Sequence, residues 1–541
     1  MNLDVNLLAS ADDLLLSSGN LHATLKARGL YNTFQFVLRL SPEVHRRLDA
    51  HQMGISSSDK VDFNTLEAFS TYLHETIHWW QHVGSTYGLM LSLSHPAQSQ
   101  ANYTHLKNLV AEVGFQKPIQ ALIGQNGRAG DLANIIVNNS FDISSFRNLT
   151  LSPVQARGVV NAPLFESVGH AYKIAYGNNV LLLGASADPE FEVLPHPKDW
   201  HEGFGDLKTA KVEGFFYGSP VGLPPLGARE IFEGQARFGQ LQYLYFATGG
   251  RLTWDDVISC KLLSGVYGEA FNWFLKFSEL SWPENVDHPT VGLFLLVCDM
   301  SINPGAGFPF SPIFFDTFIS DTDPGLRFLT LCRMVALKCP HVATAIQTYS
   351  RDEYEAVSNE LASAAIISSP LQIASTVSSW KNIGRGIRDL MNAHATFQYS
   401  PGNLVPCVLL SHYLSFSEDK YTTPEYFCWP GAWMAGGRVS EQALTLFNRH
   451  SALFCDKADD DGIFPRKYHD RADADVQKTF DTFYAVNLTY DMTRQWIMDS
   501  GAFIYDYSWL SQRASPKEMK DFADSHFQML FDVHPDAVKI L

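Results

Sequence analysis

Two histidines and one glutamate form an HExxH pattern at residues 74–78, with the sequence His74-Glu75-Thr76-Ile77-His78. On an α-helix, His74 and His78 are one turn apart, so both imidazoles project from the same face and can reach a single ion. Glu75 lies beside them, where its carboxylate can take a proton from a metal-bound water. The pattern therefore predicts two metal ligands and a general base.

The residues around this pattern predict the helix that it needs. Asn64 is followed three residues later by Glu67, which is an Asn variant of the capping box at a helix start. Apolar side chains then follow at spacings of three and four, and they form one stripe: Leu66, Phe69, Leu73, Ile77 and Trp80. At about 100° per residue, the two histidines face roughly 100–140° away from the centre of this stripe. We expect the helix to bury its stripe and to present the histidines to a cleft.

The third ligand decides the class of site, because a hydrolytic zinc site usually has three protein ligands and a water. Metzincins need Gly at position 81 and His at position 84, where this chain has Gln81 and Gly84. Deformylase-type sites use an upstream Cys, but the first cysteine is Cys260. Glutamates remain as candidates: Glu112, Glu166, Glu202 and Glu233.

The segment Arg229–Phe238 contains the sequence Glu233-Gly234-Gln235-Ala236. This Glu-Gly-x-Ala sequence resembles the second-helix motif of gluzincin metallopeptidases, whose Glu completes a zinc site. The resemblance covers the HETIH and EGQA segments. It implies that His74, His78 and Glu233 hold Zn²⁺ and that Glu75 activates the water that attacks a peptide carbonyl. Glu230, one turn before Glu233, is a candidate for orienting a ligand imidazole.

Further side chains are candidates for supporting roles. His82 lies about 12 Å along the helix axis from His74, so we expect it to line the cleft or to contact a ligand rather than to bind the metal. A donor to the oxyanion of the transition state is also needed, and the candidates are His170, Tyr217, Tyr243 and Tyr245. The acidic stretch 456–462 has Lys457 and Tyr468 where a calcium loop needs its first and twelfth ligands. We therefore interpret it as an acidic surface loop.

The composition is that of a globular protein, with 46% hydrophobic and 18% charged residues in 541. The net charge of −17 argues against a nucleic-acid partner. Seven cysteines, without a CxxC pair, indicate free thiols in a reducing compartment. The first twenty residues lack the basic start of a secretory signal, and apolar stretches such as Val291–Cys298 are shorter than the roughly 20 residues that span a bilayer. We expect a cytoplasmic protein without a membrane partner.

The chain is expected to be mainly α (α+β), in two parts. Residues 1–255 form a zincin-like catalytic domain, with a small β element at Tyr31–Leu40. A Pro/Gly-rich tract at 188–227 is expected to be a surface insertion or a loop that covers substrate. Residues 256–541 form a helical domain for substrate or partner binding, and the capping box Ser515–Glu518 predicts a helix over Lys517–Val533.

The leading hypothesis is a zinc metallopeptidase that hydrolyses a peptide bond in a specific intracellular protein or peptide. HExxH does not identify the bond that is cleaved, so a zinc hydrolase of a non-peptide amide is an alternative. A second alternative is an interaction protein whose HExxH arose by chance or has decayed.

Overall fold

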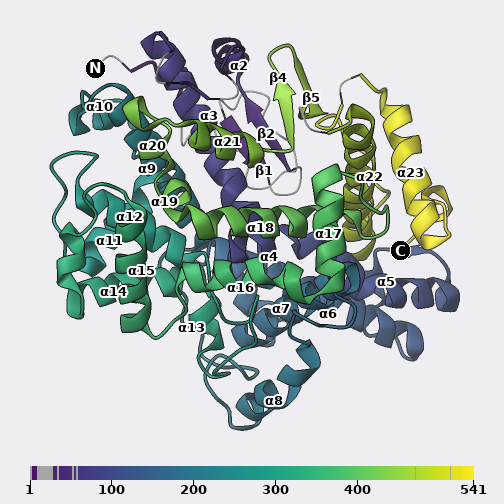
Figure 1. The fold of residues 1–541 in the computed structure, drawn as a ribbon. Helices are drawn as coiled ribbons and strands as arrows, with labels where there is room; N and C mark the ends of the chain where they lie inside the picture. Colours follow the sequence, from purple (N-terminus) through teal and green to yellow (C-terminus); the bar gives the residue numbers. More distant parts are fainter. Residues whose placement is uncertain are drawn as a thin grey trace.

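The structure is a computed structural model, and it is mainly helical, as predicted. Figure 1 shows the helices around a small sheet that lies at the top of the view. The described residues are 3–8, 29–32, 36–51, 54–56, 59–468, 471–511 and 513–541.

Helix α3 (Phe63–Gly84) carries the HExxH pattern and lies inside the molecule. It is buried continuously from Glu67 to Gly84, because other elements pack around it on several sides. These are α2 (Pro42–Leu48), α4 (Thr86–Ser92), α9 (Ala228–Ala247), α18 (Leu404–Thr422) and the strands β1 (Gly29–Asn32) and β2 (Val37–Leu40). The predicted apolar stripe is buried apart from the partly exposed Leu66. The histidine face is buried too, with His74 and His78 exposed by 1% and 8%, so it is far less accessible than a helix face on a cleft was expected to be.

The start of α3 also differs from the prediction. Asp62 is the N-cap, and its Oδ1 accepts a hydrogen bond of 2.8 Å from the backbone N–H of Thr65. Asn64 lies within the first turn. Glu67 is fully buried, and its carboxylate accepts a hydrogen bond from the backbone N–H of Asp4. The N-cap of α3 therefore lies two residues before the predicted one, and the predicted capping box between Asn64 and Glu67 was wrong.

Helix α9 is the main partner of α3 and supports Glu233. A Cβ on Gly239 would lie 2.7 Å from Ile77 Cδ1, so the absence of a side chain there permits the close approach of the two helices. Further helices pack on α9: α11 (Val266–Ser278), α12 (Pro289–Ser301), α14 (Pro324–Leu337) and α20 (Pro430–Trp433).

The remaining helices surround this centre. Three of them pack against one another: α5 (Ser94–Val113), α6 (Arg128–Leu151) and α7 (Val168–Ala187). The others are α10 (Trp254–Ser259), α13 (Phe318–Thr322), α15 (Arg351–Ala365), α16 (Pro370–Ile383), α17 (Arg385–Thr396), α19 (Pro424–Cys428), α21 (Glu441–Arg449), α22 (Asp473–Met498) and α23 (Pro516–Phe531). The capping box that starts α23 is confirmed, since Ser515 and Glu518 bond reciprocally to each other's backbone N–H.

The strands pair segments that are far apart in the chain. Strands β1 (Gly29–Asn32) and β2 (Val37–Leu40) pair antiparallel, so the single strand predicted at Tyr31–Leu40 covers parts of two strands. β2 pairs in parallel with β4 (Phe454–Lys457), and β4 pairs antiparallel with β5 (Asp460–Pro465). The predicted acidic loop is therefore part of a hairpin. Two short strands, β3 (Gln116–Lys117) and β6 (Lys539–Ile540), also pair.

Packing crosses the predicted border at residue 255. Strand β2 pairs with β4, α3 contacts α18, and α9 contacts both α11 and α20. One hydrophobic core extends from Leu3 to Phe531. The two predicted parts thus share a core, and their division into domains stays a prediction.

The Pro/Gly-rich tract at 188–227 contains α8 (His201–Thr209), and its role as an insertion or a substrate-covering loop stays a prediction. The Asp188 carboxylate accepts backbone hydrogen bonds from residues 192–194, which holds its first turn. The Phe204 ring packs edge-on against Phe315 and Phe318. Figure 1 shows α8 at the lower edge of the molecule, whereas α3 and α9 lie in its upper half.

Within the described residues, no single helix is both long and apolar enough to cross a membrane. Helices α15 and α16 reach that threshold as a pair, by length and composition, but they are bent by 101° at the break between them. All seven cysteines are free thiols.

The packing of α20 on α9 gives a test of the fold around the site. Gly431→Ala would place a Cβ 2.1 Å from the backbone oxygen of Gly239, and we expect a destabilisation of about 1–3 kcal/mol from this overpacking. Gly205→Ala on α8 meets no atom within 4 Å and is the matched control, with an expected effect between about 0 and 1 kcal/mol of stabilisation. Chemical denaturation of both variants measures the difference. Equal midpoints would contradict the close packing of α20 on α9.

Candidate metal centre

Helices α3 and α9 bring His74, His78 and Glu233 together. His78 Nε2 lies 3.2 Å from His74 Nε2 and 3.3 Å from Glu233 Oε2. His74 Nε2 lies 3.7 Å from the same carboxylate oxygen. The three side chains are buried, with at most 9% of each residue exposed. Three side chains thus converge on one point: His74 and His78, one turn apart on α3, and Glu233 on α9. Glu233 lies 155 positions after His78 in the chain.

These distances fit a tetrahedral metal site. With metal–ligand bonds of about 2.0–2.1 Å, two ligands on a tetrahedral ion lie about 3.3 Å apart. The three separations of 3.2, 3.3 and 3.7 Å are close to this value. Glu233 Oε2 is buried, and its ion-pair partners are the two imidazole nitrogens at 3.3 and 3.7 Å, which are long distances for hydrogen bonds. A cation among the three atoms would satisfy this oxygen, so these residues could hold a metal ion.

The His78 imidazole is oriented by a glutamine from its own helix. His78 Nδ1 lies 2.8 Å from Gln81 Oε1, and the Gln81 amide nitrogen donates to the backbone oxygen of Phe232 at 2.9 Å. A backbone carbonyl can only accept, so the amide oxygen of Gln81 must face His78. The proton therefore sits on His78 Nδ1. The other nitrogen, Nε2, is the one that faces Glu233, as a metal ligand requires.

Charge inside the centre is balanced without a metal. Burial alone would lower the pKa of His78, but the Glu233 carboxylate raises it to about 9. Although burial opposes its charge, Glu233 has a pKa well below its usual range, because His78 and His74 lie beside it. Burial lowers the pKa of His74 to about 3. One imidazolium and one carboxylate thus face each other, and a bound cation would take the place of the imidazolium proton.

Glu75 is the carboxylate next to the triad, and only 2% of it is exposed. Burial raises the pKa of Glu75 to about 8, the positive charges of His78 and Arg237 oppose this rise, and the Glu233 charge adds to it. Glu75 follows His74 on α3, and its charge interacts with those of His78 and Glu233, while its role as a general base stays a prediction.

Arg237 and Tyr267 complete the surroundings, and the sequence alone did not indicate either of them. Arg237 lies one turn after Glu233 on α9, is fully buried, and stacks its guanidinium 4.0 Å above the Tyr267 ring. The Tyr267 ring also meets His74 edge-on, with ring centres 5.8 Å apart. The position of Arg237, four residues after Glu233, was a usable signal. Tyr267 lies on α11 and left no signal of this kind.

The other candidate ligands lie elsewhere. Glu112 is near Arg128, Glu166 bonds to Lys208, and Glu202 is exposed in the first turn of α8. His201 and Glu202 therefore begin a helix rather than lie on a loop. Glu230 does not orient a ligand, because its carboxylate caps α9 through the backbone N–H of Gly227. His82 is buried, and its ring packs edge-on against Phe232.

The four predicted oxyanion donors also lie apart from the triad in the described structure. His170 pairs with Asp142, and Tyr217 is 73% exposed. The ring of Tyr243 packs on Phe69, and that of Tyr245 packs on Phe246. Among these tyrosines and Tyr267, only the ring of Tyr267 contacts a triad residue in the described part of the chain.

A second group of metal-ligating side chains, Asp524, His534 and Asp536, lies near the C-terminus. The ammonium of Lys520 bonds to both carboxylates, at 2.5 and 2.9 Å. A lysine therefore already compensates this acidic pair. At the triad on α3 and α9, the His78 imidazolium rather than a lysine faces the carboxylate, and a metal ion can replace its proton.

Comparisons with known proteins found no matching family model, no similar curated protein and no similar solved structure.

The roles of the glutamates can be separated by metal binding. We expect Glu233→Ala to lower the affinity for a divalent metal by more than about 100-fold, because it removes a direct ligand. Glu230→Ala, one turn away on the same helix, should lose a helix cap but keep the metal, and Glu112→Ala should leave affinity unchanged. Chelator competition on purified protein, with elemental analysis of the metal content, measures this. Retention of metal by Glu233→Ala together with its loss in Glu112→Ala would reassign the third ligand.

Proposed function

We propose that this chain is a zinc-dependent hydrolase of zincin-like type, and specifically a metallopeptidase in which His74, His78 and Glu233 hold Zn²⁺. The observation that carries the proposal is the tetrahedral spacing of the three buried donor atoms, with Glu75 beside them. Two imidazoles and one carboxylate are a donor set that zinc uses in hydrolytic sites. The sheet that contacts α3 through β1 and β2 supports a zincin-like arrangement.

The residues of the chain have distinct roles in this reaction. When bound, zinc polarises a carbonyl and lowers the pKa of a coordinated water. Glu75 accepts the proton of the attacking water and then donates it to the leaving amine. Arg237 supplies a fixed positive charge near Glu75, and the Tyr267 ring holds its guanidinium in place. Gln81 keeps His78 in the orientation that a ligand needs.

The substrate of the leading proposal is a peptide bond in an intracellular protein or peptide. The burial of the centre favours a second candidate, a zinc hydrolase of a small non-peptide amide, because His74 and Glu75 are exposed by only 1% and 2%. A small substrate needs less opening of the structure than a protein segment does. A cytoplasmic location is part of the proposal, and seven free thiols support it.

Glu75→Gln separates hydrolysis from metal binding. The amide is nearly isosteric with the carboxylate but cannot accept the proton of water, so we expect hydrolysis to fall by at least about 10²–10⁴-fold while zinc stays bound. Glu230→Gln is the control, and we expect it to keep both hydrolysis and zinc binding. The assay uses zinc-loaded protein against a peptide library and a library of small amides, which also distinguishes the two candidate substrates. Full activity in Glu75→Gln would exclude Glu75 as the base.

A further inference from the structure

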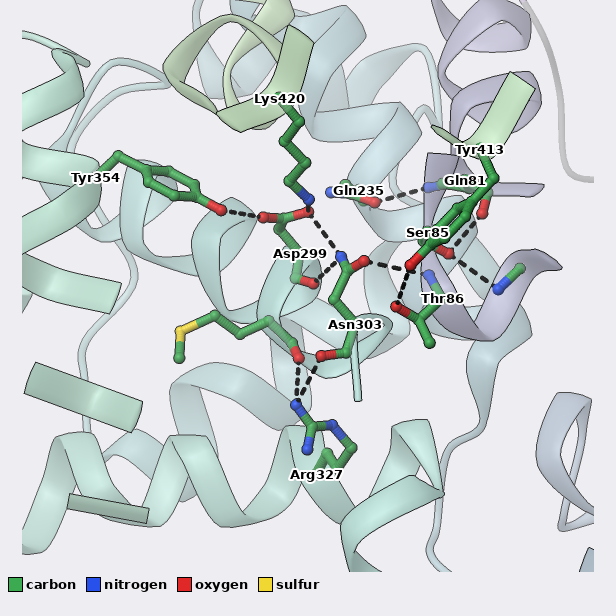
Figure 2. A network of polar contacts seen from close by, with 12 residues as sticks. Gln81, Ser85, Thr86, Gln235, Asp299, Asn303, Arg327, Tyr354, Tyr413 and Lys420 are labelled. Carbon is green, nitrogen blue, oxygen red and sulfur yellow. Dashed lines mark hydrogen bonds and ion pairs between the residues drawn. The ribbon is translucent and has the colours of Figure 1, made fainter. Parts of the chain in front are cut away.

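A series of oriented side chains leads from His78 away from the metal centre. The Gln81 amide, already fixed by the backbone oxygen of Phe232, also donates to Gln235 Oε1 at 2.9 Å. Since Gln235 uses its oxygen toward Gln81, its amide nitrogen faces the opposite way. Figure 2 shows that nitrogen directed toward the ammonium of Lys420 and the carboxylate of Asp299. The orientation of each amide thus determines the orientation of the next.

The series ends near a buried ion pair on α12 and α18. Lys420 Nζ lies 2.5 Å from Asp299 Oδ1, and the Tyr354 hydroxyl donates to Asp299 Oδ2 at 2.7 Å. The side chains of Lys420 and Asp299 are only 6% and 7% exposed. A buried ion pair rarely stabilises a protein more than a well-packed apolar pair of the same size would. The pair, whose Asp299 Oδ1 also accepts from Asn303 at 3.1 Å, is therefore weak evidence of stabilisation and is available for a positioning role.

A small cavity separates Gln235 from this ion pair. Its polar lining consists of Gln81, Ser85, Gln235, Asp299 and Lys420. The cavity offers about 20 Å³, which is enough for one water but little more. Gln235 and Lys420 supply donors to such a water, and Asp299 supplies an acceptor. The site meets the two requirements of an internal water, namely room and two to four polar partners.

We infer that Gln81 and Gln235 are positioning residues of the metal centre, and that an ordered water in this cavity connects them to the Asp299–Lys420 pair. The water accepts from the Gln235 amide and from Lys420 and donates to Asp299. Gln235 then holds the amide of Gln81, and Gln81 holds the Nδ1–H of His78. The inference rests on the proposed metal site, and it assigns the orienting role to the partner of His78, since the buried His74 Nδ1 has no hydrogen-bond partner in the described structure.

The full-length chain tests this with two kinds of measurement. Gln81→Met and Gln235→Met replace the amides by side chains of similar length. We expect zinc binding to weaken by about 10–100-fold in Gln81→Met and by about 10-fold in Gln235→Met, because loss of a residue that orients a ligand commonly has an effect of this size. Gln98→Met is the matched control, because Gln98 is a buried glutamine that donates to a backbone oxygen on another pair of helices. Its zinc affinity should stay within about twofold of the unaltered chain.

The second measurement detects the hydrogen bond itself. In ¹⁵N-histidine-labelled protein, the Nδ1–H proton of His78 should exchange slowly with solvent in both the metal-free and the zinc-loaded state. It should exchange rapidly in Gln81→Met, and Gln81→Glu, which still accepts from His78, should restore part of the protection. A merely structural role of Gln81 would leave this signal unchanged.

The ion pair is tested by the double variant Asp299→Asn/Lys420→Met, which removes both charges and leaves neither buried alone. We expect several-fold weaker zinc binding and faster Nδ1–H exchange. Unchanged exchange and affinity in Gln81→Met and Gln235→Met would overturn the positioning role, and unchanged values in the double variant would overturn its link to the ion pair. A chain that binds no zinc, but whose His78 proton responds as expected, would instead overturn the proposed function alone.

Discussion

The close packing of two buried helices, α3 and α9, determines what this protein can do. Each helix carries polar side chains into a region without solvent, and an unpaired polar group there costs free energy. The side chains therefore pair across the interface. Gln240 on α9 donates to Ser70 and Thr71 on α3, and Gln81 on α3 donates to the backbone of α9. These bonds fix the relative position of the two helices, and the triad depends on that position.

The same burial explains the electrostatics of the centre. In water, two histidines and a glutamate would interact weakly, but the low dielectric of the interior strengthens both their attraction and the cost of any unpaired charge. His78 and Glu233 resolve this by opposite shifts in pKa. Glu75 cannot pair in the same way, and burial raises its pKa instead. A divalent cation would change this balance, because its charge stabilises every carboxylate around it.

The parts of the site that lie on one stretch of chain could be predicted from the sequence. His74, Glu75 and His78 share a helical turn, so local spacing was sufficient to group them. Glu233 was indicated instead by the resemblance of its EGQA segment to a gluzincin motif, and spacing alone left Glu112, Glu166 and Glu202 as candidates. The mainly helical class and the start of α23 followed from periodicity and capping in the same way. Tyr267, Asp299 and Lys420 could not be predicted, because tertiary packing alone brings Tyr267 to His74 and brings Asp299 and Lys420 to the cavity beside Gln81 and Gln235. The sequence did not predict that the histidine face is buried, for a related reason. The apolar stripe of α3 marks only one side of the helix, but α9 covers the polar side as well. Polar residues of α9 form hydrogen bonds with the polar side chains of α3 there.

Metal binding at the triad would be linked to folding, because the three residues lie on the two helices at the centre of the core. A metal ion held by His74, His78 and Glu233 would join two helices that are far apart in the chain but form the centre of the core. A ligand that binds the folded state alone stabilises it by about 2.7 kcal/mol at a concentration 100 times its Kd. Here that free energy would act on the α3–α9 contact, against which α11, α18 and α20 pack. Loss of a bound metal would therefore destabilise the whole core. Substitutions in the tract around α8 would instead affect stability only locally.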